Sequence, residues 1–205
     1  MDEVAGTPTV FQSSRWRLLV DEPRDGPTNM AVDEALALGC DRGWSPPTLR
    51  AYRWAVPTVS LGVNQSIEGE VNLTACRERR VPVVRRPTGG RALLHHRELT
   101  YSLAIPILRG SRSVLHDYRW ISHCLLLALQ RLGVAATLSR GDPPKGETGG
   151  LCFLSSARYE IAVNGRKLIG SAQRRLSGAL LQHGSLLIEI EHPAWNALFP
   201  QGRDL

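Results

Sequence analysis

The order of strand-like and helix-like segments is the feature that most restricts what this chain can fold into. Short segments rich in β-branched and aromatic residues, bounded by glycine, proline or polar turns, predict strands. Two segments carry the three-and-four spacing of apolar residues that is typical of amphipathic helices. We expect strands near 15–20, 48–54, 58–62, 81–84, 100–105, 134–139, 159–163, 167–171 and 185–190, and helices at 28–39 and 113–132. Two helices placed irregularly among many strands exclude a repeating parallel β-α-β fold. The sequence therefore predicts an α+β fold, with a mixed, mostly antiparallel sheet flanked by helices.

Capping residues mark the ends of both predicted helices. Thr28 or Asn29 can cap the first helix, and Gly39 is expected to end it. Gly133 follows the second helix and is expected to end that one. The apolar side of the second helix comprises Val114, Tyr118, Ile121, Leu125, Leu129 and Leu132.

Composition places the chain among ordinary globular proteins. It has 205 residues, of which 42% are hydrophobic and 21% charged, so it can bury a core without disulfide bonds. We expect residues 1–14 to form a flexible lead-in and residues 15–205 to form a single domain. No run reaches the ~20 unbroken apolar residues that cross a membrane, and the first residues lack the basic-then-apolar order of a signal peptide. We therefore expect a cytoplasmic protein with no membrane partner.

The cysteines and histidines do not form a metal-binding motif. The cysteines are Cys40, Cys76, Cys124 and Cys152, and none lies in a C-x-x-C pair or at ligand spacing from a histidine. His95 and His96 are adjacent, so on an extended chain one would face the core and the other solvent. We expect no metal and no cofactor. Each cysteine is expected to be a small buried residue, unless one of them is a nucleophile.

A dense group of arginines predicts a negatively charged partner. Lysine and arginine outnumber aspartate and glutamate by 25 to 19. The densest part of the chain contains Arg77, Arg79, Arg80, Arg85, Arg86, Arg91 and Arg97. Such a group attracts nucleic acid, phosphate groups or an acidic protein, unless it is simply a solvated basic surface. Few tyrosines and phenylalanines are available for base stacking and no nucleic-acid motif is present, so nucleic acid is not expected as a partner.

The glycine-rich turn GDPPKGETGG at residues 141–150 does not match a phosphate-binding loop. Such a loop needs a lysine where Glu147 stands, because that cation neutralises the terminal phosphates. A carboxylate would repel them. The sequence therefore predicts an ordinary surface turn here.

Cys152 and Lys167 are the pair most suggestive of chemistry. Cys152 follows glycines 149–150, where small residues leave a side chain accessible. The Asn-Gly pair at 164–165 predicts a two-residue hairpin turn, with Lys167 at the start of the following strand. A free thiol is only about 3% thiolate at neutral pH, and a nearby ammonium favours the thiolate. The spacing indicates either an activated nucleophile or an ordinary cysteine and a surface lysine.

Three segments, taken in order, resemble the biotin/lipoate protein ligase-transferase superfamily: RRPTGGRALLHHRELTYSLAIP, CFLSSARYEIAVNGRKLIGSAQRR and LLQHGSLL. The likeness runs from about Met30 to Ile190. Lipoate-protein ligases typically have a third glycine followed by His-Asp, whereas Arg91 takes that glycine position here and ELTYS follows at 98–102. That pattern, with the Cys-Phe pair upstream of NGRKLIGSAQ, is similar to the octanoyl-[acyl-carrier-protein]:protein N-octanoyltransferases. The resemblance implies the class II aminoacyl-tRNA synthetase-like catalytic fold of the superfamily.

The resemblance also implies an activity and a set of site residues. The enzyme would move an octanoyl group from octanoyl-acyl carrier protein to a lysine of a lipoyl-domain protein, such as glycine cleavage H protein. Cys152 would carry the acyl group as a thioester, and Lys167 would lower the pKa of its thiol. Acidic carrier proteins would account for the arginines. Substrate contacts would come from Arg85, Arg86, Gly89, Gly90, Arg91, His95, Gly170, Ser171, Ala172, His183 and Gly184.

Two features depart from the family pattern, and two other functions stay open. His96 stands where family members often have an acidic residue. The chain ends soon after the HGSLLIE segment, where relatives usually continue, so a truncated or minimal C-terminus is expected. One open function is an ATP-dependent lipoate-protein ligase of the same fold, which would work without Cys152. The other is a non-catalytic module that binds acyl carriers or nucleic acid without turnover.

Overall fold

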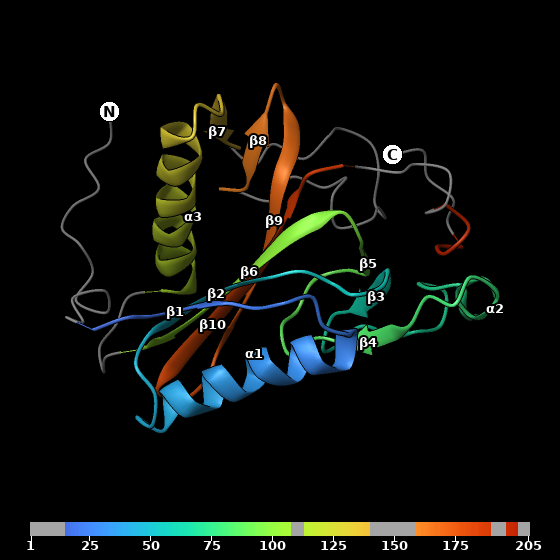
Figure 1. Cartoon of the computed structure of the whole chain (residues 1–205), viewed down its shortest axis with the longest axis horizontal. Helices are drawn as coiled ribbons and strands as arrows, with labels where there is room; N and C mark the ends of the chain where they lie inside the picture. Colours follow the sequence, from blue (N-terminus) through green and yellow to red (C-terminus); the bar gives the residue numbers. More distant parts are fainter. Residues whose placement is uncertain (1–14, 108–112, 140–158, 190–195, 201–205) are drawn as a thin grey trace.

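The computed structural model describes residues 15–107, 113–139, 159–189 and 196–200, and Figure 1 shows their arrangement. The helices are α1 (Gly26–Asp41), α2 (Leu73–Glu78) and α3 (Val114–Arg131). The strands are β1 (Arg17–Val20), β2 (Thr48–Tyr52), β3 (Thr58–Leu61), β4 (Val83–Arg85), β5 (Leu93–His95), β6 (Glu98–Pro106), β7 (Ala136–Leu138), β8 (Ile161–Val163), β9 (Arg166–Arg175) and β10 (Ala179–Leu187). This mixture confirms the predicted α+β class.

Among the described residues, the main sheet has seven strands in the order β1-β2-β6-β10-β9-β8-β7. Only the β1–β2 pair is parallel, and the other neighbours in this sheet are antiparallel. The prediction of a mixed, mostly antiparallel sheet is therefore confirmed. β6 and β10 pair along nine residues, from Glu98 opposite Leu187 to Pro106 opposite Ala179.

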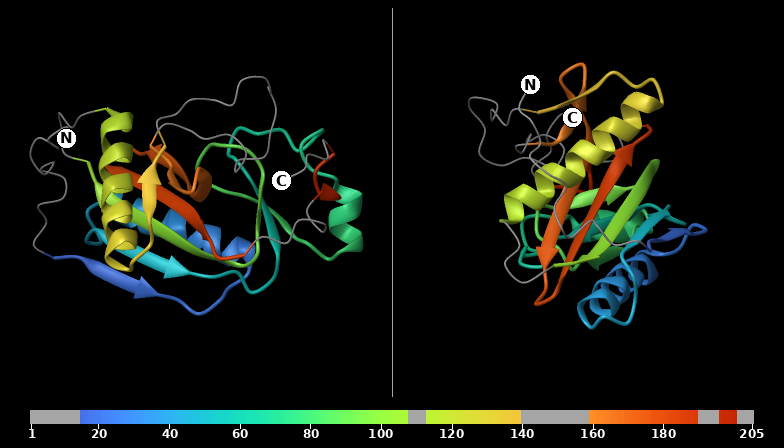
Figure 2. Two further views of the ribbon diagram at one scale, coloured as in Figure 1. Left: turned by 90° about the horizontal axis from the view of Figure 1, so that it is seen from above. Right: turned by 90° about the vertical axis from the view of Figure 1, so that its left-hand side faces the viewer.

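Helices α1 and α3 cover opposite faces of the main sheet (Figure 2). Leu103 and Ile105 of β6 pack with Ile121 of α3. Ala104, which lies between them in β6, packs with Cys40 of α1. Because successive residues of a strand point to opposite faces, these contacts place one helix on each side. Cores therefore form on both faces of the sheet.

A second, smaller sheet has the order β4-β3-β5 and packs with α2 around its own core. The buried members of that core are Val59, Leu61, Val71, Ala75, Cys76, Ala92, Leu94, Leu198 and Phe199. The connection between β4 and β5 folds back against the end of β3, where a Cβ on Gly62 would lie 2.1 Å from the carbonyl oxygen of Gly90. Glycine at position 62 lets the two backbones touch, and this contact fixes the connection that carries part of the site.

Helix α1 begins earlier and ends later than its sequence predicts. Asp25, rather than Thr28 or Asn29, caps it by accepting a hydrogen bond from the backbone amide of Thr28 at 2.8 Å. The expectation that Gly39 ends the helix is wrong, because the last turn continues past it to Asp41. A Cβ at position 39 would lie 3.0 Å from the hydroxyl oxygen of Ser45. That glycine instead lets the departing chain pass close to the helix.

Helix α3 follows its prediction closely. Ser113 caps it, and Gly133 follows it with a φ of +81°, a conformation that favours glycine. Ile121 is buried against the sheet, whereas Val114 and Leu132 at the two ends are exposed. The apolar stripe is therefore shorter than the periodicity indicates. No helix in the described ranges is long and apolar enough to span a membrane.

The strand predictions succeed where the signal is local. Asn164 and Gly165 have φ values of 51° and 76°, which confirms the two-residue hairpin turn between β8 and β9. The strand predicted at 185–190 is displaced, because β10 spans Ala179–Leu187. β5 and α2 were not predicted. The polar sequence Gln182-His183-Gly184 hides the first half of β10, since its side chains are buried in a hydrogen-bond network.

Candidate functional site

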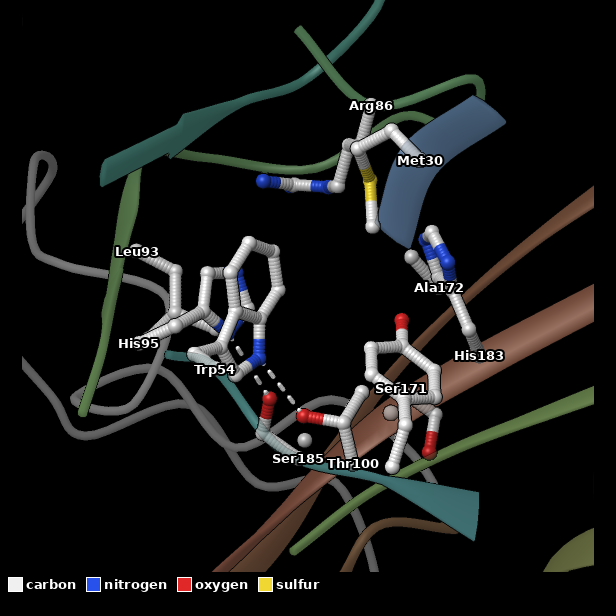
Figure 3. Close-up of a pocket in the computed structure, with 13 residues that line it drawn as sticks. Met30, Trp54, Arg86, Leu93, His95, Thr100, Ser171, Ala172, His183 and Ser185 are labelled. Carbon is white, nitrogen blue, oxygen red and sulfur yellow. Dashed lines mark hydrogen bonds between the residues drawn. The ribbon is translucent and has the colours of Figure 1, made fainter. Parts of the chain in front are cut away.

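A cavity opens between the small sheet, helix α1 and the paired strands β9 and β10 (Figure 3). Its empty volume is about 420 Å³, counted out to its open mouth, and its wall is mostly apolar. The lining residues are Met30, Tyr52, Trp54, Arg86, Leu93, His95, Thr100, Gly170, Ser171, Ala172, His183, Gly184 and Ser185. An apolar wall with a few fixed polar groups is typical of a small-molecule site.

His95 is held at one side of the cavity through both of its ring nitrogens. Its Nδ1 lies 2.7 Å from Oε1 of Glu98, and its Nε2 lies 2.7 Å from the hydroxyl of Ser60. Because an ionised carboxylate can only accept, Nδ1 donates to Glu98, while Nε2 shares a second hydrogen bond with the Ser60 hydroxyl. Trp54 stacks on the imidazole with ring centroids 4.0 Å apart and planes 13° apart. These contacts fix the orientation of the ring.

Glu98 accepts hydrogen bonds from several polar side chains on this side of the cavity. Its Oε1 accepts from the hydroxyls of Thr100 at 2.7 Å and Ser185 at 2.6 Å, as well as from His95. The indole of Trp54 donates to Thr100 at 2.8 Å. Burial by itself raises the pKa of Glu98, but the charge and hydrogen bond of His95 and the two hydroxyls hold it below its ordinary value. A buried carboxylate therefore lies directly behind the cavity wall.

His183 is held in the same manner on the other side. Its Nδ1 lies 3.0 Å from Oδ2 of Asp33, and its Nε2 lies 2.6 Å from the hydroxyl of Thr88. Asp33 and Thr88 are both fully buried. By the same reasoning, Nδ1 donates to the carboxylate, and Nε2 shares a hydrogen bond with the Thr88 hydroxyl. Asp33 of α1 and Thr88 of the β4–β5 connection thus both bond to the imidazole of His183 on β10.

Asp33 is fixed by several donors besides His183. Its Oδ1 accepts from Arg50 at 2.8 Å and from Ser102 at 2.6 Å, and its Oδ2 accepts from the hydroxyl of Tyr52 at 2.9 Å. Burial raises the pKa of Asp33, but hydrogen bonds from His183, Ser102 and Arg50, together with the His183 charge, hold it below its ordinary value. The carboxylate is therefore a rigid, ionised support for the imidazole.

Arg86 ties the β4–β5 connection to the cavity. Its guanidinium donates to the carbonyls of Gly89 and Arg91, both at 2.8 Å, and to the hydroxyl of Ser60 at 3.0 Å. Gly90 has a φ of +93°, and a Cβ there would lie 2.7 Å from this guanidinium. The backbone of the segment Arg-Pro-Thr-Gly-Gly-Arg thus curls around the guanidinium of its first residue, Arg86.

The backbones of β9 and β10 form another part of the cavity wall. A Cβ on Gly184 would lie 2.6 Å from both the hydroxyl oxygen of Ser171 and the ring of Tyr101. The Tyr101 hydroxyl lies 2.8 Å from that of Ser171 and accepts from the amide of Gln182 at 2.8 Å. Burial raises the pKa of Tyr101 to about 12. Glycine at position 184 is therefore required by close packing across three strands.

Lys167 lies on β9, three residues before the cavity begins. Its ammonium nitrogen is 2.7 Å from Oε1 of Glu160, and both side chains are 5% exposed. The pairing of β8 with β9 shifts by one residue here, so that Leu168 forms a bulge. Bulges often re-aim side chains beside functional sites. Cys152 lies outside the described residues, and its partnership with Lys167 stays a prediction.

The cavity gathers most of the residues predicted to bind substrate, namely Arg86, His95, Gly170, Ser171, Ala172, His183 and Gly184. Gly89 and Gly90 lie in the segment wound around Arg86. Arg85 and Arg91 do not line the cavity in the described part of the chain. Arg85 donates to the carbonyl of Gly62 at 2.7 Å, and Arg91 lies 3.6 Å from Glu70.

Sequence reasoning missed the residues that complete the wall and its support, which are Met30, Asp33, Tyr52, Trp54, Thr88, Leu93, Glu98, Thr100 and Ser185. One signal was present in α1. Asp33 shares the buried side of that helix with Met30, Ala37 and Cys40. An acidic residue on the buried side of a helix needs a buried partner, and that requirement points to a polar site.

The three described cysteines are poor candidates for a nucleophile. Cys40 and Cys76 are buried, as predicted, and Cys124 is exposed, so the expectation of burial is wrong for that residue. Burial raises the pKa of the Cys40 thiol to about 11, and it also raises the pKa values of Cys76 and Cys124. No group of His, Cys, Asp and Glu within the described ranges could hold a metal ion.

Comparison with known proteins supplies the family. A family model described as the lipoyl protein ligase A/B catalytic domain matches residues 25–203. The octanoyltransferase LipM of Symbiobacterium thermophilum is 49% identical over 187 residues, which cover 88% of this chain and 68% of that protein. The octanoyltransferase LipM of Kyrpidia tusciae is 43% identical over 199 residues, covering 92% and 72%. The chain thus spans about two thirds of the length of these curated relatives.

Solved structures show the same fold. Protein Ta0514 of T. acidophilum, with bound lipoic acid, superposes with a TM-score of 0.72 at 23% identity, covering 92% of this chain and 74% of that one. A lipoate-protein ligase A bound with ATP superposes with a TM-score of 0.72 at 24% identity, covering 90% and 71%. At these identities the likeness concerns the fold alone. Together with the family model and the relatives, it shows that the chain is an acyltransferase with the biotin/lipoate ligase fold and belongs to the lipoyl protein ligase A/B catalytic-domain family.

Proposed function

We propose that this enzyme moves an octanoyl group from octanoyl-acyl carrier protein to a lysine of a lipoyl-domain protein, through a thioester on Cys152. The observation that carries the proposal is the apolar cavity along β9 and β10, with the buried ammonium of Lys167 on the same strand just outside it. Relatives named octanoyltransferases support the choice of acyl group.

The cavity suits an aliphatic chain. Met30, Tyr52, Trp54 and Leu93 supply apolar surface, and the histidine nitrogens are already occupied by hydrogen bonds. Burying a methylene is worth ~0.8 kcal/mol, so the six methylenes of an octanoyl chain contribute roughly 5 kcal/mol. That energy would hold the acyl group in the enzyme between the two half-reactions.

The reaction would proceed through two acyl transfers. The Cys152 thiolate attacks the carbonyl carbon of the donor thioester, and the phosphopantetheine thiolate leaves. The amine of the acceptor lysine then attacks the new thioester, the Cys152 thiolate leaves, and the nitrogen loses a proton to form the amide. The thioester exchange is nearly balanced in energy, so no ATP is consumed.

Two features would assist these steps. The ammonium of Lys167 favours the thiolate form of a neighbouring cysteine, while Glu160 holds that ammonium in place and offsets part of its charge. β8 pairs with β9 only as far as Ile169. Among the strands that the structure describes, β9 pairs only with β10 from Gly170 onward, so amides on its other side can stabilise the oxyanion of a tetrahedral intermediate.

Intact-mass analysis after incubation with octanoyl-acyl carrier protein tests this proposal. We expect the protein to gain one octanoyl group, which hydroxylamine removes and which moves to an added lipoyl-domain protein. Cys152→Ser abolishes the transfer, while Cys124→Ser retains it. Full transfer by Cys152→Ala would overturn the covalent route. Product formed from free octanoate only when ATP is present would identify a ligase instead.

A further inference from the structure

The pairing of β9 with β10 distinguishes two ends of the cavity. Gly170 lies opposite Ser185, and Ala172 lies opposite His183. Lys167 precedes Gly170 on β9, so the Ser185 end is nearer to the proposed reaction centre. Ala172 lies two residues, about 7 Å, farther along the strand. His183 therefore stands at the end where the tail of a bound acyl chain would arrive.

Figure 3 shows the same separation, with His183 and Ala172 on one side of the cavity and His95 on the other. Met30 of α1 projects between Arg86 and His183. Met30 and the imidazole of His183 thus both line the tail end of the cavity. Met30 comes from α1, which packs on the main sheet, and His183 comes from β10, a strand of that sheet.

The imidazole of His183 turns its nitrogens away from the cavity. They bond to Asp33 and Thr88, neither of which is a lining residue. The ring therefore presents its carbon edge to the acyl tail. A ring released from either partner could turn, and an N–H or lone pair facing the apolar chain would be left without a hydrogen bond.

The two supports of this ring are themselves held by further hydrogen bonds and by burial. Asp33 is bonded to Arg50, Ser102 and Tyr52, and the Arg50 side chain is fully buried. Thr88 is fully buried, and its carbonyl accepts from the amide of Val63 at 2.8 Å. The end wall is therefore rigid although it is made from a polar side chain.

We propose that Asp33 and Thr88 are positioning residues that lock His183 as the end wall of the acyl pocket and thereby set the length of acyl chain that the enzyme accepts. This inference rests on the proposed function, because it requires the cavity to hold the acyl chain. It adds a specificity role for three residues that are joined by two hydrogen bonds.

The test measures kcat and KM with carrier protein loaded with acyl chains of six, eight, ten and twelve carbons. Thr88→Val keeps the volume of the side chain and removes the hydroxyl, whereas Thr88→Ser keeps the hydroxyl. His183→Ala removes the end wall. Thr137→Val makes the same chemical change in β7, where the hydroxyl bonds the carbonyl of Ala162.

We expect Thr88→Val and His183→Ala to raise the ratio of kcat/KM for ten carbons over eight carbons roughly tenfold, because two more methylenes become buried. The change should appear in KM. Thr88→Ser and Thr137→Val should keep the original ratio. An unchanged ratio in Thr88→Val and His183→Ala, or an equal loss at every chain length, would overturn the inference. Failure of the unmodified enzyme to transfer any chain would instead overturn the proposed function, and the inference with it.

Discussion

At the scale of single residues, the ion pair of Lys167 with Glu160 determines how the role of the lysine can be tested. Both side chains are almost fully buried and lie 2.7 Å apart. Removing one member of a buried pair is strongly destabilising, because a charge then loses its counter-charge. A substitution of Lys167 alone would therefore mix an effect on the thiol with an effect on the fold. Removing both charges separates the two.

We expect the double variant Lys167→Met with Glu160→Gln to fold and to lose most of its transfer activity. The pKa of the Cys152 thiol should move toward the ordinary value of ~8.5, because the ammonium no longer favours the thiolate. Lys167→Arg keeps a positive charge in a different geometry, so it should retain partial activity. The measurement is the pH profile of Cys152 alkylation by iodoacetamide, read by mass spectrometry of the modified peptide.

Glu160→Gln alone keeps a side-chain oxygen that can still accept from the ammonium, and once its folding is verified it should shift the thiol pKa in the opposite direction. It leaves the ammonium in place and removes the carboxylate, so the alkylation profile should move to lower pH. If the profiles of the double variant and the unmodified enzyme coincide, the lysine does not set the thiol pKa, and any role it has must be exerted on the acyl carbonyl.

At the scale of elements, the structure divides the arginines that the sequence presents as one group. Arg77, Arg79 and Arg80 are exposed on and beside α2. Arg86 is buried and holds its own loop together. Arg97 is paired with Glu189 at 2.6 Å. The basic surface available to an acidic partner is thus the α2 end of the small sheet.

We expect Arg79→Glu to slow association with octanoyl-acyl carrier protein while leaving kcat at saturation nearly unchanged, because a rim charge steers encounter more than it affects the bound state. The rate of association should also fall steeply with ionic strength, since the Debye length is only about 8 Å at physiological salt. Stopped-flow measurement of Cys152 acylation at several salt concentrations provides both results.

Arg166→Glu, on the β8–β9 hairpin, is the matched control with the same charge change. Arg166 is exposed at the start of β9 in the main sheet, whereas α2 packs on the small sheet. Equal slowing by both variants would mean that only the net charge matters. No slowing by either would leave α2 as a solvated surface.

The elements also show which structure is readable from sequence alone. The hairpin at Asn164 and Gly165 and the end of α3 before Gly133 are encoded by neighbours in the chain, and both were predicted correctly. The first half of β10 was missed because Gln182 and His183 look like loop residues until their buried partners are known. Likewise, Gly39 resembles a residue that ends a helix, but what its missing side chain allows is the close packing of Ser45 against the helix.

Only those site residues that lie in recognisable sequence motifs could be predicted. His95, His183 and the glycines of β9 and β10 belong to segments that resemble a known family. Asp33, Thr88 and Glu98 act from behind the wall. Glu98 lies only three residues from its histidine, but Asp33 and Thr88 reach theirs through contacts that only the folded chain creates. Nothing in the local sequence pairs Asp33 with His183, which lies 150 residues away.

At the scale of the whole molecule, these buried carboxylates couple stability to pH. The pKa of Glu98 is below its ordinary value in the folded state. A group of this kind stabilises the fold fully above its unfolded pKa, ~4.3 for glutamate, and the contribution is lost as the pH falls through the folded value. The free energy of unfolding should therefore decrease as the pH falls below about 4.3.

We expect Glu98→Gln to be less stable at neutral pH and to have a shallower loss of stability between about pH 4.5 and pH 3. The amide cannot gain the charge that His95 and the two hydroxyls stabilise. Urea denaturation at a series of pH values measures the slope. Glu68→Gln, at an exposed position, is the control and should retain the slope of the unmodified protein. Equal slopes for Glu98→Gln and the unmodified protein would contradict the assignment.

The position of β10 has a consequence for synthesis of the protein. It is the last described strand in the chain, yet it occupies the middle of the seven-stranded sheet, between β6 and β9. As the chain leaves the ribosome, β1, β2 and β6 can form one partial sheet and β7, β8 and β9 another. Neither partial sheet contains the complete cavity. Before β10 is added, Asp33 lacks its partner His183, and Glu98 lacks its partner Ser185. The cavity is therefore completed late, when β10 pairs with both partial sheets. Its residues His183 and Ser185 then supply hydrogen-bond partners to the buried carboxylates of Asp33 and Glu98.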